Sequence, residues 1–213
     1  MKTLALAALV AAQPSLGITA EVVPFDGSWK EQGFLRLLSN DYVQRGEQLD
    51  VVSDGTVSLL WRPIEQSRRS AQVASWAWRV QESVAATDLT VKGGDDRNLA
   101  VYFVFVDPGR VEALAGGSVR RILRERSAQA LIYVWGGKHD RGAILPSPYS
   151  AQLRTKVLRG SGTGAHRETV DLISDYREAF GSRPGALVGL AVSADSDDTK
   201  GKIKASISDL AVK

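Results

Sequence analysis

The sequence predicts a mainly β protein, a single antiparallel β-sandwich of the jelly-roll type with one or two short helices. Three observations lead to this prediction. Apolar and polar residues alternate along most segments, which is the period of a strand. Gly, Pro, Asn and Asp separate these segments from one another. Only two segments favour a helix, and many short strands with few helices are typical of a sandwich.

The first twenty residues predict a secretory signal peptide. Lys2 supplies a positive start, an apolar run follows from Leu4 to Ala12, and "GITAE" offers small residues for cleavage after Ala20. The apolar run is shorter than the ~20 residues that span a bilayer, which argues against the alternative of a signal anchor. We therefore expect a signal peptide at 1–20, one domain at 21–213 and a periplasmic or secreted protein, with no membrane span after cleavage.

The first strands follow from alternation. In "SDGTVSLLWRP", Asp54 and Gly55 form a turn, and the strand that follows ends at Pro63. In "VASWAWRVQ", Trp76 and Trp78 share one face, which we expect to pack inward. The segment "NLAVYFVFV" is apolar on both faces, as expected of a central strand that is covered on both sides.

The second half of the chain offers further strands and two helices. Strand candidates are "ALIYVWGG", "AQLRTKVLRG", "HRETVDL", "ALVGLAVSAD" and "KIKASISDLAVK". One helix is expected at Ser118–Arg126. A second is expected at Leu172–Phe180, with Asp171 as N-cap and Gly181 as its stop. Leu172, Tyr176 and Phe180 recur at helical spacing, so this helix is expected to cover one sheet face.

Several classes of function are excluded. The chain has no cysteine, so disulfides, thiolate catalysis and Cys-ligated zinc are ruled out. After loss of Lys2, 26 basic residues face 24 acidic ones, and this dispersed charge does not favour nucleic acid. His139 and His166 fall in no metal-ligand or nucleophile motif.

An ordered set of motifs resembles a known family. The segments "SWAWRV", "GGDDRNLAVYFVF", "ALIYVW", "SPYSAQLRTKVL", "SDYREAFG" and "ADSDDTKG…ISDL" are similar to the uncharacterised bacterial family catalogued as domain of unknown function 3047, most strongly over 71–212. The resemblance implies an exported bacterial protein with a sandwich similar to carbohydrate-binding modules and no established activity. Ala77, Ala100 and Ile132 stand where the family pattern has polar residues, which points to an altered site.

The candidate ligand-binding residues are Arg79, Asp96, Trp135 and Tyr149. Trp135 precedes the polar loop "GGKHDRG", and Tyr149 lies in "PSPYS", so each could present a ring to a ligand. Asp95 and Asp96 have two interpretations. In the first, one of the two aspartates is a binding or acid/base group near Arg79. In the second, which we favour, Asp95 or Asp96 accepts hydrogen bonds from backbone N–H groups in the Gly93–Gly94 turn. Core packing is the alternative for Trp135.

A second acidic group, "ADSDDTKG", contains Asp195, Asp197 and Asp198. Oxygen ligands at alternate positions suit calcium, although the spacing does not follow the EF-hand pattern. The alternative is a solvated turn in which Asp197 and Thr199 form local hydrogen bonds. No other cofactor is expected.

These observations favour a non-catalytic binding module for a glycan or another component of the cell envelope. The chain shows no spacing of activated groups that identifies a catalyst. An enzyme acting on a polysaccharide, with a carboxylate, Tyr149 or His139 as acid/base group, remains open, as does a structural envelope protein.

Overall fold

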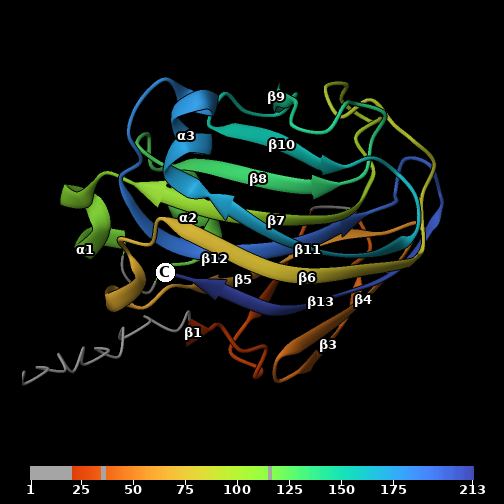
Figure 1. Ribbon diagram of the computed structural model, residues 1–213, viewed down its shortest axis with the longest axis horizontal. Helices are drawn as coiled ribbons and strands as arrows, with labels where there is room; N and C mark the ends of the chain where they lie inside the picture. The colour runs from red at the N-terminus through yellow and green to blue at the C-terminus, as the bar shows by residue number, and fades with distance from the viewer. Residues whose placement is uncertain (1–20, 35–36, 115–116) are drawn as a thin grey trace, which may run out of the picture.

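The computed structural model describes residues 21–34, 37–114 and 117–213. The predicted signal peptide at 1–20 lies outside the described residues. Two sheets pack face to face around one large apolar core (Figure 1). A mainly β fold with few short helices is therefore confirmed.

The first sheet has six strands in the order β11-β6-β13-β4-β3, with β1 paired to β13. Its strands are β1 (Glu21–Val22), β3 (Asp41–Arg45), β4 (Gln48–Asp54), β6 (Val73–Glu82), β11 (Gly164–Asp171) and β13 (Lys202–Val212).

The second sheet has seven strands in the order β2-β5-β12-β7-β8-β10-β9. Its strands are β2 (Lys30–Gly33), β5 (Val57–Pro63), β7 (Arg97–Val106), β8 (Gln129–Trp135), β9 (Ile144–Pro146), β10 (Leu153–Arg159) and β12 (Ala186–Asp195). The prediction of purely antiparallel pairing is wrong at one place, because β10 pairs with β8 in parallel. The chain between them first forms β9, which takes the antiparallel position beside β10.

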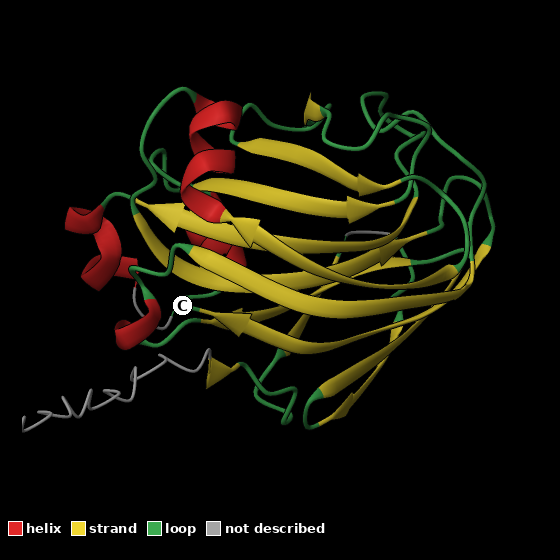
Figure 2. Cartoon of the chain, in the orientation of Figure 1, coloured by secondary structure: helices red, strands yellow, loops and turns green. Residues whose placement is uncertain are grey.

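The described helices are short and lie toward one end of the sheets (Figure 2). They are η1 (Gln66–Arg68), η2 (Pro108–Arg110), α1 (Val111–Leu114), α2 (Val119–Leu123) and α3 (Leu172–Phe180). None of the described helices is long and apolar enough to cross a membrane. The helix expected at Ser118–Arg126 corresponds to α2, which is shorter and is capped by the Ser118 side chain.

Helix α3 has the predicted bounds. The side chain of Asp171 accepts a hydrogen bond from Ser174 N at 2.9 Å, and Gly181 ends the helix at φ 72°. Tyr176 is buried and meets Phe105 edge to face, with 5.1 Å between the ring centroids. Phe180 is only partly buried, so it contributes less to this packing than the sequence suggested.

The core between the sheets contains the two tryptophans of β6. Trp76 and Trp78 are 1% and 2% exposed, so the prediction that they face inward is confirmed. On β7, Phe103 and Phe105 also point into this core, whereas Ala100 and Val104 belong to a second apolar cluster on the opposite face. Residues of α1 and α2 join that second cluster. These two helices, and not α3, therefore account for part of the outer apolar surface of β7.

Candidate ligand-binding site

The candidate site lies on the outer face of the seven-stranded sheet, the face turned away from the six-stranded sheet. Strand alternation brings small and apolar side chains from neighbouring strands to this face, namely Leu59 and Trp61 of β5, Ala191 of β12, Val104 of β7, and Ala130 and Ile132 of β8. A cavity of about 390 Å³ opens over them. This volume lies within the usual range of small-molecule sites.

Trp61 forms part of the floor of this cavity. Its indole ring lies over Gly189 of β12, where a Cβ atom would come within 1.9 Å of the ring. Gly189 therefore makes the space that the ring occupies. Trp61 is 4% exposed, and its Nε1 atom has no hydrogen-bond partner among the residues that the structure describes.

One end of the cavity is polar and is organised by Arg97, the first residue of β7. Arg97 Nη1 donates to Asp95 Oδ2 at 3.1 Å and to Asp195 Oδ2 at 3.0 Å. Its Nη2 donates to the hydroxyl of Tyr102 at 3.0 Å. Asp195, the last residue of β12, stands directly opposite Arg97 in the strand register. The sheet pairing thus fixes this cluster of charges at the strand ends.

Tyr149 closes the rim of the cavity beside this cluster. Its hydroxyl donates to Asp95 Oδ1 at 2.7 Å, while its side chain remains exposed. Lys92 Nζ lies 5.4 Å from the centroid of its ring. Burial, together with the hydrogen bond to Asp95, raises the pKa of Tyr149 to about 12, so the hydroxyl stays protonated at neutral pH. Phe34 and Leu37 supply further exposed apolar surface at the cavity.

Burial also acts on Asp195, which is 7% exposed. It raises the pKa of Asp195 to about 9 against the opposing charge of Arg97, and the charges of Asp197 and Asp95 act in the same direction as burial. Asp195 Oδ1 accepts no hydrogen bond within the described chain, and the neighbouring carboxyl group of Asp197 can only accept the proton of Asp195. The polar end therefore holds more carboxyl groups than Arg97 can neutralise.

Asp96 has a structural role that Asp95 does not share. It is fully buried, and its carboxylate accepts hydrogen bonds from the backbone N–H groups of Asp198 and Thr199 at 3.3 and 2.7 Å. The favoured interpretation of the Asp pair thus has the right chemistry for Asp96, but the donors come from the loop after β12 and not from the Gly93–Gly94 turn. Asp95, and not the predicted Asp96, lines the cavity.

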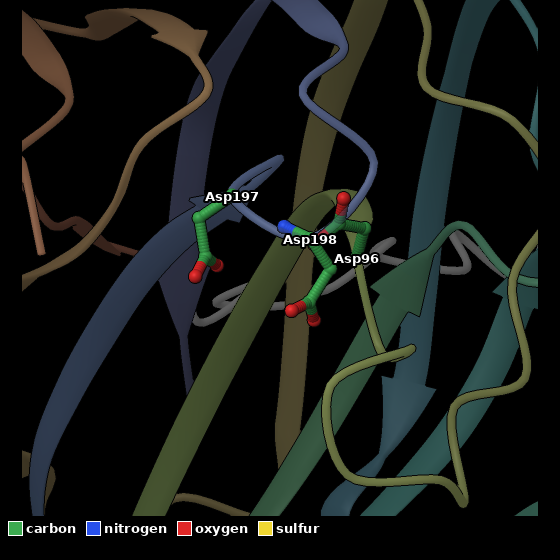
Figure 3. Close-up of side chains that lie close together, drawn as sticks. All are labelled: Asp96, Asp197 and Asp198. Carbon is green, nitrogen blue, oxygen red and sulfur yellow. The ribbon is translucent and has the colours of Figure 1, made fainter.

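A cation site was expected at Asp195, Asp197 and Asp198. The structure instead groups Asp96 with Asp197 and Asp198, with one carboxylate oxygen of each within 4.8 Å of the others (Figure 3). Asp195 contributes to the Arg97 cluster. Three carboxylates are suitable ligands for a hard cation such as calcium. However, Asp96 already accepts hydrogen bonds from the loop, which gives the cluster a role in holding that loop without any ion.

The other predicted ligand contacts lie away from the cavity. Trp135 is 2% exposed and packs against Trp78 in the core, so its ring is not available to a ligand at the surface. Arg79 lies on the outer face of the six-stranded sheet, in a separate polar hollow with His166 and Ser206. Of the four predicted residues, the structure places only Tyr149 at the cavity.

Among the described residues, neither histidine lies in a catalytic arrangement with other side chains. His139 Nε2 accepts a hydrogen bond from Leu89 N at 3.2 Å and lies 3.2 Å from Asp88 Oδ1. His166 packs against Trp135, with 5.0 Å between the ring centroids. Both rings are used in packing or in loop hydrogen bonds.

Sequence reasoning missed Trp61 and Arg97 as parts of the site, and of the two adjacent aspartates it chose Asp96 instead of Asp95. A usable signal was the alternation that places Trp61 on the same face as Leu59, together with Arg97 directly before an apolar strand. The pairing of Arg97 with Asp195 joins residues 98 positions apart, and no local pattern indicates it.

The fold and the site together define a mainly β protein of two packed sheets with a ligand-sized cavity on one outer face. The chain belongs to the family described as "Protein of unknown function (DUF3047)", whose model matches residues 27–211. A comparison with curated proteins finds no match.

Solved structures with a similar chain path include two glycan-active enzymes. The xyloglucanase domain of NopAA, a type three effector from Sinorhizobium fredii in complex with cellobiose, has a TM-score of 0.47 and 10% identity, covering 87% of this chain and 92% of that one. The family 11 xylanase from Neocallimastix patriciarum has a TM-score of 0.41 and 12% identity, covering 80% and 83%. Both likenesses are distant.

Proposed function

We propose that the protein is a non-catalytic binding module for a glycan or another component of the cell envelope, and that the ligand enters the cavity on the outer face of the seven-stranded sheet. The observation that carries this proposal is the cavity itself. It combines apolar walls with a few fixed polar groups at one end, which is the usual composition of a small-ligand site.

The arrangement of the carboxyl groups favours binding over catalysis. Glycoside hydrolysis requires two carboxyl groups on either side of the scissile bond, about 5 to 9 Å apart. Asp95 and Asp195 both accept hydrogen bonds from the same Nη1 of Arg97, so the guanidinium occupies the space between them. A sugar ring cannot take that place while the cluster is intact.

An enzyme is the second candidate, and one observation favours it. Asp195 has its pKa raised to about 9 by burial, so it would hold a proton at neutral pH, as a general acid must. Tyr149 and Asp197 line the same cavity. In that case, hydrolysis or elimination within a bound polysaccharide would require the proton of Asp195 in addition to the charge of Arg97.

The predicted export and jelly-roll class belong to the same proposal. A periplasmic or secreted location would give the module access to glycans and other envelope components. Resemblance to carbohydrate-binding modules remains a sequence prediction that agrees with two packed sheets and an open outer face.

The test uses a matched pair of variants. Thr155 lines the cavity on β10, whereas Thr169 lies exposed on β11 of the other sheet. Binding of a panel of glycans and small envelope components is measured by tryptophan fluorescence, because Trp61 alone among the five tryptophans lines the cavity. We expect Thr155→Phe to abolish binding and Thr169→Phe to leave it unchanged.

The same incubations are assayed for new reducing ends and for unsaturated uronates. Binding without turnover supports the module. Turnover that Asp195→Asn removes would replace it with the enzyme. If no component of the panel binds the wild-type protein, or if Thr155→Phe binds as well as the wild-type protein, the proposed site is wrong.

A further inference from the structure

The balance of charge at the polar end of the cavity indicates which kind of ligand the cavity accepts. Four carboxyl groups line the cavity, those of Asp95, Asp195, Asp197 and Asp198, against the single guanidinium of Arg97. Two lysines lie nearby: Lys92 over the Tyr149 ring and Lys200, whose charge acts on Asp198. Inside the cavity the balance of charge is negative.

Arg97 is already paired with carboxyl groups of the chain itself. Its guanidinium already contacts Asp95, Asp195 and Tyr102. Asp197 and Asp198 form no ion pair with any described residue. Burial and the neighbouring carboxylates raise the pKa of Asp198, which shows the same surplus of negative charge.

A second, independent feature points to a hydrogen-bond donor from outside the chain. Asp195 is more than nine-tenths buried and lines the cavity, and its Oδ1 atom accepts no hydrogen bond within the part of the chain that the structure describes. The carboxyl group of Asp197 lies within hydrogen-bonding reach of it, so this contact joins two acceptors that share at most the proton of Asp195. An ammonium group bound at Asp197 would bring a donor to this contact and relieve the repulsion between the carboxyl groups.

The remaining walls of the cavity are apolar and indicate the chemistry of the rest of the ligand. Leu59, Trp61, Leu89 and Ile132 present hydrocarbon and aromatic surface, and Phe34 and Leu37 extend it at the mouth. Such walls favour an apolar body, because burial of apolar surface is favourable and the walls offer few groups for hydroxyls. A neutral sugar would meet hydrogen-bond partners mainly at the polar end, so its hydroxyl groups along the apolar walls would lack them.

We propose that the ligand is a small amphiphile with a protonated amine, in which the ammonium group lies among Asp195, Asp197 and Asp198 and an aliphatic or aryl body covers Trp61 and Leu59. This proposal rests on the proposed function, since it names the ligand class of the same cavity. Of the two ligand classes in the proposed function, this proposal favours an apolar envelope component over a neutral glycan.

The experiment compares three probes that share one body: phenylbutylamine, phenylbutanol and phenylbutyrate. Dissociation constants are measured by calorimetry at pH 7 and low salt, with cellotriose as the neutral glycan. A charge-assisted hydrogen bond to a carboxylate is worth about 1.5–3 kcal/mol, which corresponds to about 10- to 100-fold in affinity. We expect the amine to bind at least tenfold more tightly than the alcohol, and the carboxylate to bind most weakly.

Two asparagine variants localise the effect. Asp197→Asn removes one charge from a half-buried site at the cavity, whereas Asp140→Asn changes an exposed residue that does not line it. We expect Asp197→Asn to reduce the preference for amine over alcohol several-fold and Asp140→Asn to leave it unchanged. Melting temperatures of both variants verify that they are folded.

The outcomes separate this proposal from the function on which it rests. Equal affinity for amine and alcohol, with Thr155→Phe still blocking both, would overturn the charge preference and leave the cavity as the binding site. Tighter binding of cellotriose than of the amine would also overturn it. Calcium that raises the melting temperature of the wild-type protein but not of Asp197→Asn would assign the carboxylates to a metal and overturn it as well. Failure of every probe and of the whole glycan panel would overturn both proposals.

Discussion

Arg97 is the residue whose removal should cost the fold most at the cavity. Its guanidinium is the only cation that contacts Asp95 and Asp195 among the described residues, and the side chains of all three are less than 15% exposed. Arg97→Met keeps most of the length of the side chain but leaves the carboxylate of Asp95 without its cation and the carboxyl group of Asp195 without its hydrogen-bond donor. Breaking a buried pair in this way costs about 3–5 kcal/mol, and we expect a loss of that size.

The expected loss depends on Asp195, which gives the prediction a second test. Asp195→Asn removes one of the stranded carboxyl groups, so the double variant should lose at least about 1 kcal/mol less than the two single losses combined, as coupled neighbours do. Urea unfolding followed by circular dichroism measures each free energy, provided that the m-values agree.

A matched control is available at Arg167, which pairs with Asp209 on the exposed surface. Arg167→Met should cost less than about 1 kcal/mol, because exposed ion pairs contribute little. A loss for Arg97→Met no greater than that of this control, or one unchanged in the Asp195→Asn background, would contradict the role given to the Arg97 pairs.

Three further predictions concern pH, the floor of the cavity and helix α3. Burial raises the pKa of Asp195 from 3.8 in the unfolded chain to about 9, so the folded state holds this proton more tightly. The wild-type protein should therefore lose stability as the pH rises from about 4 to about 9, and Asp195→Asn should lose less; parallel pH curves of the two proteins would contradict the shift. Gly189→Val should displace the Trp61 ring, destabilise the protein by about 1–3 kcal/mol and change its fluorescence; an unchanged spectrum and stability would mean that the ring does not lie over Gly189. Tyr176→Ala should cost about 3–5 kcal/mol in urea unfolding and Phe180→Ala clearly less, since Tyr176 is buried and Phe180 only partly so; the reverse order would show that the end of α3 carries its packing.

Local chemistry explains why parts of the fold could be predicted. Helix α3 has its expected bounds because both of its end signals, Asp171 and Gly181, act within a few residues of it. Trp76 and Trp78 could be placed in the core because the alternate residues Ser75, Ala77 and Arg79 are small or polar. When one face of a strand is polar, the sequence indicates that the opposite face is the buried one.

Strand β8 has no polar face that would indicate which of its sides is buried. "ALIYVW" is apolar on both faces, so the sequence could not tell that Trp135 points into the core while Ile132 lines the cavity. The sheet order decides this, and it comes from pairings between distant segments. The parallel pairing of β8 and β10 depends on the same long-range contacts.

The choice between Asp95 and Asp96 shows the same limit. Asp95 and Asp96 lie side by side directly before β7, and only Asp95 lines the cavity. Asp96 is held by the backbone of Asp198 and Thr199, about a hundred positions further along the chain. Without that contact, the two aspartates are equivalent in the sequence.

The most direct test of a ligand site on the seven-stranded sheet is an NMR titration of the labelled protein with phenylbutylamine and with the glycan panel. The largest amide shifts should fall on Ala130, Ile132 and Ala191, which line the cavity on β8 and β12. Shifts concentrated at Ala77, Arg79 and Ser206, in the polar hollow of the six-stranded sheet, would contradict it.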